Sequence, residues 1–426
     1  RVLRQGARLI SRNKESGDLM NFAASRLSVV KPSASAAVSA QASALKAAGH
    51  SVVDLGLGEP DFDTPEHIVE AAYQAARAGQ TRYTPTGGTV ELREAVVAKF
   101  DRENALNFSV DDIIVSNGAK QVIFDAFMAT LEPGQEVILC APYFDIYKTM
   151  TSVIGGTPVT VQCSADDQFR LTPEALEAAI TSSTRWLLLN LPSNPAGACY
   201  TIDELRALGD VLQRNPHVLI LADEIYEHII FDGREFVSFA SACPELRDRM
   251  LVVNGVSKAY AMTGWRIGYG AGPAGLITEM TKVQSQISSG SCSVAQAAAA
   301  AALNGPQDHI GQFRAAFERR RNLVVDGISK IPRLSLDPPG GAFYTLIGCD
   351  NVIGAMTPDG NGIRDDADFA RFLLEDGHVG CVPGAAYGLS PFIRFSTATS
   401  DENLNEAVSR VAKSVAKLTL RDGINA

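Results

Sequence analysis

Residues 218–226 read Val-Leu-Ile-Leu-Ala-Asp-Glu-Ile-Tyr, an uninterrupted apolar run that ends on two acidic residues. A short apolar run of this kind is typical of a strand that is buried on both faces. A helical pattern from Asp203 to Arg214 precedes it. Strands that alternate with helices predict an α/β fold, with a mostly parallel sheet covered on both faces. We predict strands at residues 112–116, 136–140, 159–161, 185–190, 218–222, 251–254 and 267–271.

The pattern changes after Pro306. This second half mixes helices with isolated short strands, so we predict a smaller α+β domain there, which the helical segment 28–49 is expected to join. We predict a long helix, two short strands and a closing amphipathic helix at residues 312–330, 342–347, 392–396 and 401–418. The predicted order is an N-terminal extension, the first part of the small domain with a connecting loop, the large domain and the rest of the small domain, at residues 1–27, 28–64, 65–310 and 311–426.

The composition is that of an ordinary globular protein, since the 426 residues are 46% hydrophobic and 20% charged. The net charge of -10 argues against binding to nucleic acid or to an anionic membrane surface. Seven cysteines without a close pair argue against a disulfide framework and a Cys-rich zinc site, and favour the reducing cytoplasm. No apolar stretch approaches the ~18 residues of a transmembrane helix.

The first residues carry basic side chains only. Arg1, Arg4, Arg8, Arg12 and Lys14 are accompanied by no acidic residue, which loosely resembles a mitochondrial transit segment. A second interpretation, which we favour, is that translation starts at Met20 and that residues 1–19 are an upstream remnant. In either case the segment takes no part in the predicted fold.

Four short motifs lie at predicted strand ends or in the loops that follow them. In open α/β sheets, ligands bind at that edge. Each motif alone has an ordinary structural explanation, such as a helix cap, a turn or a solvated loop lysine. The motifs are Ser-Lys-Ala-Tyr-Ala-Met-Thr-Gly-Trp-Arg (257–266), Ala-Asp-Glu-Ile-Tyr (222–226), Asn-Leu-Pro-Ser-Asn-Pro-Ala-Gly (190–197) and Phe-Ile-Arg-Phe-Ser (392–396).

Together these motifs resemble the class I aminotransferases, which have the fold-type I architecture and use pyridoxal 5'-phosphate (PLP). The resemblance runs from about Lys31 to the C-terminal helix. It is greatest to the bacterial aspartate aminotransferase subgroup, which includes aspartate/prephenate aminotransferases. The resemblance implies PLP as the cofactor, amino acids and 2-oxo acids as substrates, and a homodimer with shared active sites.

Three residues match the catalytic residues of that family. Lys258 would bind PLP covalently and move the proton between the substrate α-carbon and the cofactor, and cationic neighbours in an enclosed site would keep its amine neutral. Asp223 would keep the pyridine nitrogen protonated, so that the ring can accept electrons. Tyr226 would donate a hydrogen bond to the cofactor's phenolic oxygen, and Asn194 would donate to the same oxygen.

The loop 117–120 is expected to bind the phosphate, since its glycine admits the backbone and the following helix N-terminus attracts an anion. The resemblance adds Arg266 as the phosphate-binding cation, and Tyr83 as a tyrosine that reaches the phosphate of the neighbouring subunit. The family often has a hydroxyl where this chain has Gly255, and Ser257 is expected to replace it in part. The predicted phosphate-binding residues are Gly118, Ala119, Lys120, Ser257, Arg266 and Tyr83.

Phe144 matches the aromatic residue that stacks on the PLP ring. The most similar subgroup usually has Trp at this position. Phe retains a face for stacking but lacks the indole N–H and some of the area. Core packing is the alternative interpretation of Phe144.

Arg394 matches the arginine that binds the substrate α-carboxylate as a bidentate fork, with Gly58 and Asn194 beside it. For a second carboxylate, the subgroup uses a lysine in the phosphate loop and a hydroxyl in a Lys-Pro-Ser-Ala-Thr motif. The equivalents here are Lys120 and Ser35, the latter in Lys-Pro-Ser-Ala-Ser (31–35). We therefore predict a dicarboxylic substrate, while a phosphate-loop or surface role for Lys120 stays open.

The predicted reaction is a ping-pong transfer of an amino group from an L-amino acid, with aspartate favoured, to 2-oxoglutarate. Prephenate, aromatic or neutral amino acids are alternative substrates, and another PLP-dependent lyase reaction is an alternative activity. A ligand-sensing regulator with this fold is a different class, which the presence of Lys258 disfavours. No P-loop supports a generic nucleotide-binding protein.

Metal catalysis finds no support in the sequence. The six histidines are scattered, and no His-Glu-x-x-His motif occurs. His228 alone lies near the predicted site, two residues after Tyr226, and we interpret it as a structural histidine.

Overall fold

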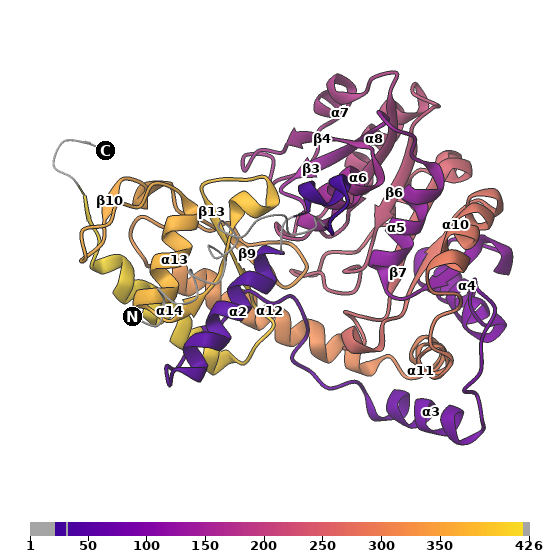
Figure 1. Cartoon of the computed structure of the whole chain (residues 1–426), viewed down its shortest axis with the longest axis horizontal. Coiled ribbons are helices and arrows are strands. Elements are labelled where there is room, and N and C mark those ends of the chain that lie inside the picture. Colours follow the sequence, from indigo (N-terminus) through magenta and orange to yellow (C-terminus); the bar gives the residue numbers. More distant parts are fainter. Residues whose placement is uncertain (1–21, 31–32, 421–426) are drawn as a thin grey trace.

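The computed structural model describes residues 22–30 and 33–420. Most of the predicted N-terminal extension lies outside the described residues, as do Lys31 and Pro32 of the 31–35 motif. The described chain forms a large α/β part and a smaller part, and the long helix α12 (Asp308–Ile328) runs between them (Figure 1).

Seven strands of the described chain form the central sheet of the large part, in the order β2-β8-β7-β6-β5-β3-β4. They run parallel to one another except for β8, which is antiparallel to both of its neighbours. The mostly parallel sheet predicted from the apolar runs is therefore present, with residues 268–271 as a reversed strand. The strands are β2 (Ile113–Ser116), β3 (Glu136–Ala141), β4 (Thr157–Gln162), β5 (Thr184–Asn190), β6 (Leu219–Asp223), β7 (Met250–Gly255) and β8 (Gly268–Ala271).

Helices cover both faces of this sheet. Within β5, Trp186 and Leu188 pack into one core, whereas Leu187 and Leu189 pack into the other, as expected when successive side chains point to opposite faces. The first core includes α5 (Ala119–Thr130), α6 (Asp145–Ile154) and α10 (Ala274–Ile287). The second includes α3 (Glu66–Arg77), α4 (Val90–Asn104), α7 (Pro173–Ala179), α8 (Ile202–Gln213), α9 (Phe239–Ala242) and α11 (Ser293–Asn304).

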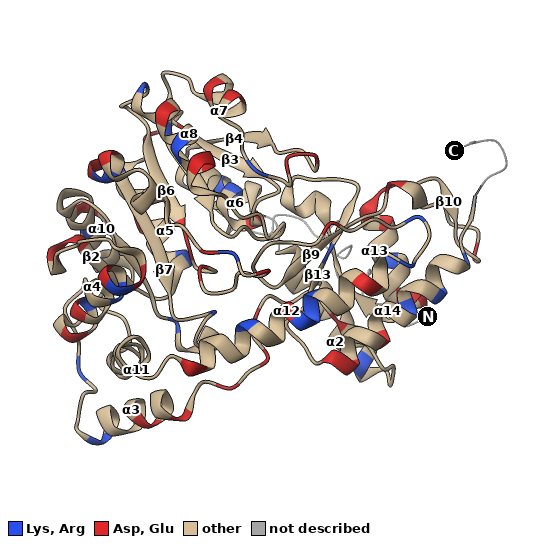
Figure 2. Cartoon of the chain, turned by 180° about the vertical axis from the view of Figure 1, so that it is seen from behind, with Lys and Arg blue, Asp and Glu red and all other residues tan. Residues whose placement is uncertain are grey.

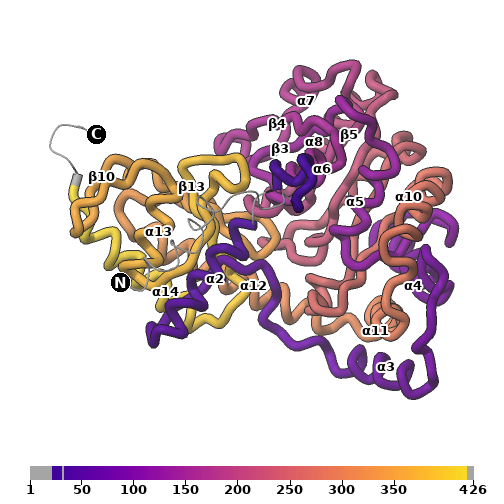
Figure 3. Tube along the Cα trace, viewed as in Figure 1, coloured from indigo at the N-terminus to yellow at the C-terminus, as the bar shows by residue number. Residues whose placement is uncertain are grey.

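The smaller part is built on the antiparallel sheet β12-β13-β9. Helix α2 (Ala34–Ala47) comes from the other end of the sequence, yet it contacts β1, β11 and β12 and lies among the C-terminal elements in Figure 3. The remaining elements are α13 (Asp366–Asp376), α14 (Asp401–Ala416), β9 (Tyr344–Gly348), β12 (Val382–Pro383), β13 (Phe392–Ser396), and the pairs β1 (Val53–Asp54) with β11 (Val379–Gly380) and β10 (Ala355–Met356) with β14 (Thr419–Leu420).

The large and the small part have separate hydrophobic cores. The cores of the large part draw on residues 68–303, and that of the small part draws on residues 53–55 and 324–418. The predicted domain boundaries near 64 and 310 fall between these ranges. A further cluster, which includes Tyr226 and Tyr344, joins the loop after β6 to the start of β9 and so bridges the two parts.

Helix α13 was not among the elements predicted from the sequence. It begins after Asp365, whose side chain accepts a hydrogen bond from the backbone N–H of Asp368. Asp365, Asp366 and Asp368 favour the start of a helix, but aspartate is a poor helix former in a helix interior, so an Asp-rich segment resembles a loop in the sequence.

Charged residues lie mainly on helices and loops, while most of each central strand carries other residues (Figure 2). This distribution agrees with a sheet that is buried on both faces. Among the described helices, none combines the length and the apolar character that crossing a bilayer would require.

Candidate active site

Several of the predicted site residues of the large part lie at one edge of the central sheet. The carboxyl ends of parallel strands meet at the same edge, and β8, which runs the other way, begins there. The residues that follow or end these strands are Gly118 after β2, Phe144 after β3, Asn194 after β5, Asp223 in β6 and Lys258 after β7, with Arg266 just before β8.

Lys258 is half-buried in the loop after β7. Its Nζ donates a hydrogen bond to the carbonyl oxygen of Gly58, at 2.6 Å. The ring centroids of Phe343 and Tyr226 lie 5.5 and 5.8 Å from the same nitrogen. The amine is therefore held between a backbone carbonyl and two aromatic rings.

The charge state of Lys258 is set by its surroundings. Burial above all, together with the cationic Arg394 and Arg266, lowers the pKa of its amine to about 8, although Glu59 and Asp223 act in the opposite direction. A lysine with this pKa supplies an appreciable fraction of neutral, nucleophilic amine near pH 7, which a solvated lysine does not.

Asp223 is a buried carboxylate with two donors on it. The hydroxyl of Tyr147 donates to Oδ2 at 2.6 Å, and the backbone N–H of Ile225 donates to Oδ1 at 3.3 Å. Burial raises the pKa of Asp223 to about 6, although both donors act to lower it. Near neutral pH this carboxyl group is largely ionised, and a buried carboxylate stabilises a cation placed beside it, such as a protonated ring nitrogen.

Tyr226 pairs with a residue of the small part. Its hydroxyl lies 3.0 Å from that of Tyr344, the first residue of β9, and the two rings meet edge to face. Burial raises the pKa of both phenols, so both hydroxyls keep their protons near neutral pH. Tyr226 can therefore donate its proton to a third group.

Arg394 uses its guanidinium to join three segments. Its Nη1 donates to Oδ1 of Asn194 at 3.1 Å, and its Nη2 donates to Oγ of Ser35 at 3.1 Å and to the carbonyl oxygen of Gly56 at 2.6 Å. Because Oδ1 of Asn194 accepts this bond, the Nδ2 group of Asn194 is left as a donor for another partner.

The guanidinium of Arg394 is buried, with 2% of the residue exposed, and the rings of Tyr344 and Tyr387 lie 4.4 and 4.9 Å from its Cζ. Among the described residues, all groups that accept hydrogen bonds from it are neutral, and its Nε has no partner. A buried cation without a carboxylate partner is costly, which points to a site for an anion.

The two residues predicted for a second carboxylate lie in different surroundings. Ser35 accepts the hydrogen bond from Arg394, and its Oγ lies 3.5 Å from the hydroxyl of Tyr387. Lys120 is exposed, and its Nζ lies 5.6 Å from the ring centroid of Phe144. Ser35 therefore lies beside Arg394, the residue predicted to bind the first carboxylate.

A crowded glycine loop precedes α5. Gly118 has φ of 90° at the N-cap of the helix, and a Cβ there would collide with Nη2 of Arg266. A Cβ on Gly268 would likewise collide with the backbone nitrogen of Ala119. Arg266 is exposed and donates to the carbonyl oxygen of Asn117 at 3.2 Å. This brings a cation to the first turn of a helix, a combination suited to a phosphate.

The family's hydroxyl position, here Gly255, has little space for a side chain. A Cβ on Gly255 would lie 3.0 Å from Cα of Gly268 and 3.0 Å from the carbonyl oxygen of Ile267. Ser257 is buried in the same loop, one residue before Lys258.

Tyr83 lies outside the site of its own chain. It is 100% exposed, in the loop that precedes α4. The next residue, Thr84, donates a hydrogen bond from its hydroxyl to the carbonyl oxygen of Ser291 at 3.4 Å. The side chain of Tyr83 is therefore not buried among the site residues of its own chain.

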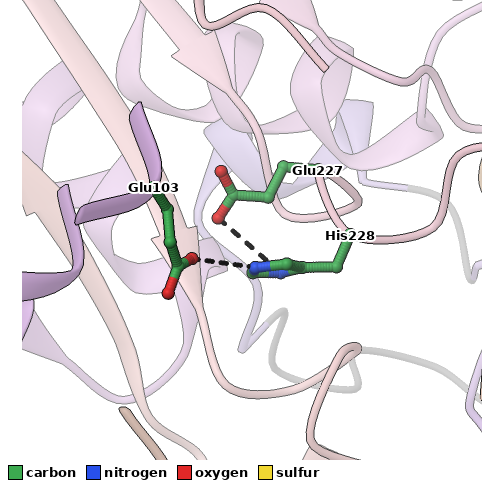
Figure 4. Close-up of side chains that lie close together, drawn as sticks. All are labelled: Glu103, Glu227 and His228. Atoms are coloured by element: carbon green, nitrogen blue, oxygen red, sulfur yellow. Dashed lines mark hydrogen bonds and ion pairs between the residues drawn. The ribbon is translucent and has the colours of Figure 1, made fainter. Parts of the chain in front are cut away.

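The two residues that follow Tyr226 in the chain, Glu227 and His228, belong to an ion network. His228 shares a hydrogen bond with Oε2 of Glu103 at 2.9 Å, and Glu227 is nearby (Figure 4). These three residues could hold a metal ion by their spacing. However, the buried ammonium of Lys99 already forms an ion pair with Glu227 and lies 3.6 Å from Glu103, so a cation of the protein occupies the position.

Sequence analysis missed three tyrosines at this site, namely Tyr147, Tyr344 and Tyr387. Each contacts a residue that was predicted: Tyr147 contacts Asp223, Tyr344 contacts Tyr226, and the ring of Tyr387 lies near the guanidinium of Arg394. For Tyr147 a signal existed, because it lies three residues after Phe144 and therefore on the same side of a helix.

Comparison with known proteins agrees with the family resemblance of the sequence motifs. Residues 50–411 match the family "Aminotransferase class I and II". An aspartate aminotransferase of Rhizobium meliloti (strain 1021) is 52% identical, over 93% of this chain and 97% of that protein. An aspartate/prephenate aminotransferase of Cereibacter sphaeroides (strain ATCC 17029 / ATH 2.4.9) is 49% identical, over 92% and 98%.

Solved structures agree with this result. The crystal structure of the aspartate aminotransferase from Rhizobium meliloti has a TM-score of 0.92 at 51% identity, with 94% of this chain and 100% of that chain covered. The aspartate aminotransferase from Thermus thermophilus with maleate has a TM-score of 0.86 at 39% identity, with 93% and 100% covered. The chain therefore belongs to the class I and II aminotransferases.

Proposed function

We propose that this protein is a PLP-dependent aminotransferase that moves an amino group from aspartate to 2-oxoglutarate in a ping-pong reaction. One observation carries the proposal: Lys258, with its lowered pKa, lies close enough to the buried carboxylate of Asp223 and to the uncompensated cation of Arg394 for both charges to act on its amine. The names of the relatives from Rhizobium meliloti support aspartate as the substrate.

The residues present suit PLP. The loop at Gly118 has no room for a side chain and lies beside Arg266, as a phosphate would require. Lys258 is the covalent attachment point, and Asp223 stabilises the protonated ring nitrogen. Tyr226 and the free Nδ2 of Asn194 donate hydrogen bonds to the phenolic oxygen. When bound, PLP supplies a sink for the electrons of the substrate's Cα–H bond.

The remaining proposed contacts surround these groups. Ala119 supplies a backbone N–H to the phosphate at the first turn of α5, Ser257 contributes its hydroxyl to the same group, and Phe144 stacks on the ring. Lys258 moves the proton of the substrate, because its neutral amine can accept a proton at Nζ and return it at a neighbouring carbon.

Arg394 binds the α-carboxylate of the substrate, with Gly58 beside it. The buried guanidinium has neutral partners and an unsatisfied Nε, so a carboxylate would complete its hydrogen bonds and balance its charge. Ser35 orients Arg394 through the bond between them. We propose Lys120 as the cation for the second carboxylate of the substrate, since it is exposed and lies over Phe144 at the edge of the site.

We further propose a homodimer with shared sites, in which Tyr83 reaches the phosphate bound by the other subunit. Its complete exposure supports this role. All seven cysteines are free, which agrees with a reducing compartment, and we propose the cytoplasm.

The test is the visible absorbance of the purified protein during titration with one amino acid at a time. Aspartate should convert the band of Lys258-bound PLP into that of the aminated cofactor, and 2-oxoglutarate should restore it. The control variant Lys258→Ala should show neither the covalent band nor turnover. A band that responds to neutral or aromatic donors alone would reassign the substrate, and turnover by Lys258→Ala would refute the mechanism.

Prephenate is a second candidate acceptor. The relatives from Cereibacter sphaeroides and Rickettsia bellii that carry prephenate in their names are 49% and 47% identical to this chain. Restoration of the original band by prephenate, after aspartate has aminated the cofactor, would establish this activity.

A further inference from the structure

The hydroxyl of Tyr344 lies among the predicted site residues, although no sequence motif indicated it. It is 3.0 Å from the hydroxyl of Tyr226, and Tyr344 as a whole is buried. A Cβ on Gly58 would collide with this same hydroxyl. Since Lys258 donates to the carbonyl oxygen of Gly58, Tyr344 lies next to the loop that holds the reactive amine.

The strand register explains why Tyr344 lies there. Leu346 of β9 pairs with Arg394 of β13, and Tyr344, two residues earlier, therefore lies on the same face of the sheet as Arg394. The guanidinium of Arg394 packs on its ring at 4.4 Å. The ring therefore contacts the guanidinium of Arg394, and its hydroxyl end lies against Gly58.

Within the described chain, the hydroxyl of Tyr344 forms a hydrogen bond with Tyr226 alone. A tyrosine hydroxyl has one proton to donate and an oxygen that accepts. If Tyr226 donates its proton to the phenolic oxygen of PLP, as proposed above, then its oxygen is free to accept, and the proton of the pair must come from Tyr344. Hydrogen bonds in such a chain polarise and strengthen one another.

We infer that Tyr344 is a positioning residue, which donates its hydroxyl proton to Tyr226 and thereby strengthens the hydrogen bond from Tyr226 to the phenolic oxygen of PLP. The inference rests on the proposed function. It adds a link between the two parts of the molecule, since Tyr226 belongs to the loop after β6 and Tyr344 begins β9. Tyr344 then has two contacts in the site: its ring packs against Arg394, and its hydroxyl supports Tyr226 as a donor to the cofactor.

The test is a pH titration of the visible absorbance of bound PLP, which reports the protonation of the cofactor. A donor to the deprotonated oxygen stabilises that form, so its loss raises the pH of the spectral midpoint. Tyr344→Phe, which retains the ring, should raise the midpoint by about 0.3 pH unit, against about 1 unit for Tyr226→Phe. Thermal unfolding of each variant checks that the fold is intact.

A double-mutant cycle separates action through Tyr226 from a general change of the site. Because Tyr344 acts through the Tyr226 hydroxyl, Tyr344→Phe should have no further effect on the midpoint in a Tyr226→Phe background. Tyr387→Phe is the matched control, since it removes a hydroxyl from the other ring on Arg394, and that hydroxyl lies near Ser35. It should leave the midpoint unchanged.

Four outcomes would overturn the inference. An unchanged midpoint in Tyr344→Phe would refute it while leaving the proposed function intact, because the cofactor band itself is then present. An equal shift in Tyr387→Phe, or additive shifts in the double variant, would show a general effect on the site. Absence of any visible PLP band in the unmodified protein would refute the proposed function and the inference together.

Discussion

The surroundings of Lys258 lower the pKa of its amine and so raise the fraction of the reactive, neutral form. Its amine is buried and has two arginines nearby, so its pKa falls to about 8 from the ordinary value of 10.5. The lowered value means that the neutral amine appears at a pH where a solvated lysine is still charged.

This pKa predicts how the cofactor-free protein takes up PLP. Because the neutral amine is the form that reacts, the initial rate of covalent uptake should rise with pH through about 8 and level off above it. Stopped-flow absorbance at constant ionic strength measures the profile. A rate that continues to rise beyond pH 10, as expected for an unperturbed lysine, would contradict the lowered pKa.

Lys120 allows a test of substrate choice. Loss of a charged partner of the second carboxylate costs about 1.5–3 kcal/mol, so Lys120→Ala should lower kcat/KM for aspartate roughly 10- to 100-fold, with little change for alanine. Steady-state kinetics with the two donors measures the ratio. Lys148→Ala, which removes an exposed lysine of α6, is the control. Equal losses for both donors would assign Lys120 to the phosphate.

At the scale of elements, a buried ion pair connects α4 to the loops that carry the site residues. Lys99 of α4 contacts Glu227, which follows Tyr226, and Glu227 also accepts a hydrogen bond from Asn254 of β7 at 2.7 Å. Although burial alone would raise it, Lys99 and His228 hold the pKa of Glu227 below its usual value. Glu227 therefore needs its cation.

Removal of that cation should destabilise the fold. Lys99→Met leaves a buried carboxylate without its partner, which costs about 3–5 kcal/mol of unfolding free energy. Chemical denaturation at pH 7 measures the change. Adding Glu227→Gln should recover part of the loss, whereas breaking the exposed pair of Lys282 and Glu279 by Lys282→Ala should have little effect. A small loss in Lys99→Met would show that the loops hold their positions without the ion pair.

At the scale of the whole molecule, the site combines distant segments, and one predicted residue lies outside it. Arg394 of the small part contacts Ser35 and Gly56 from the N-terminal end, while Lys258 and Asp223 come from the large part. Tyr83 faces solvent in the single chain. Under the proposed function, each site is complete only when a second copy supplies Tyr83.

Mixed dimers test this arrangement. Lys258→Ala and Tyr83→Phe should each form impaired homodimers, but subunit exchange between them creates dimers with one intact site. That site takes Lys258 from the Tyr83→Phe subunit and Tyr83 from the Lys258→Ala subunit. The mixture should therefore bind PLP more tightly than the Tyr83→Phe homodimer, measured by PLP titration. Titration curves equal to the sum of the separate proteins would refute the shared site.

The sequence alone predicted the sheet and the residues at its edge. Apolar runs and the turns between them are local features, and parallel strands bring the residues after them, such as Asp223 and Lys258, to one edge without further information. The family resemblance supplied expected roles, and it also located Arg394. In the same way, the helix of residues 28–49 was expected beside the C-terminal elements, and α2 lies there.

Only the tertiary structure decided which side chains meet. Tyr147 and Asp223 are 76 positions apart, Tyr226 and Tyr344 are 118 apart, and Ser35 and Arg394 are 359 apart, so no local pattern records these contacts. The lowered pKa of Lys258 is likewise a product of burial and of charges from both parts. Local periodicity determines elements and their edges, whereas hydrogen bonds, charge states and the choice of partners arise when the packed parts exclude water.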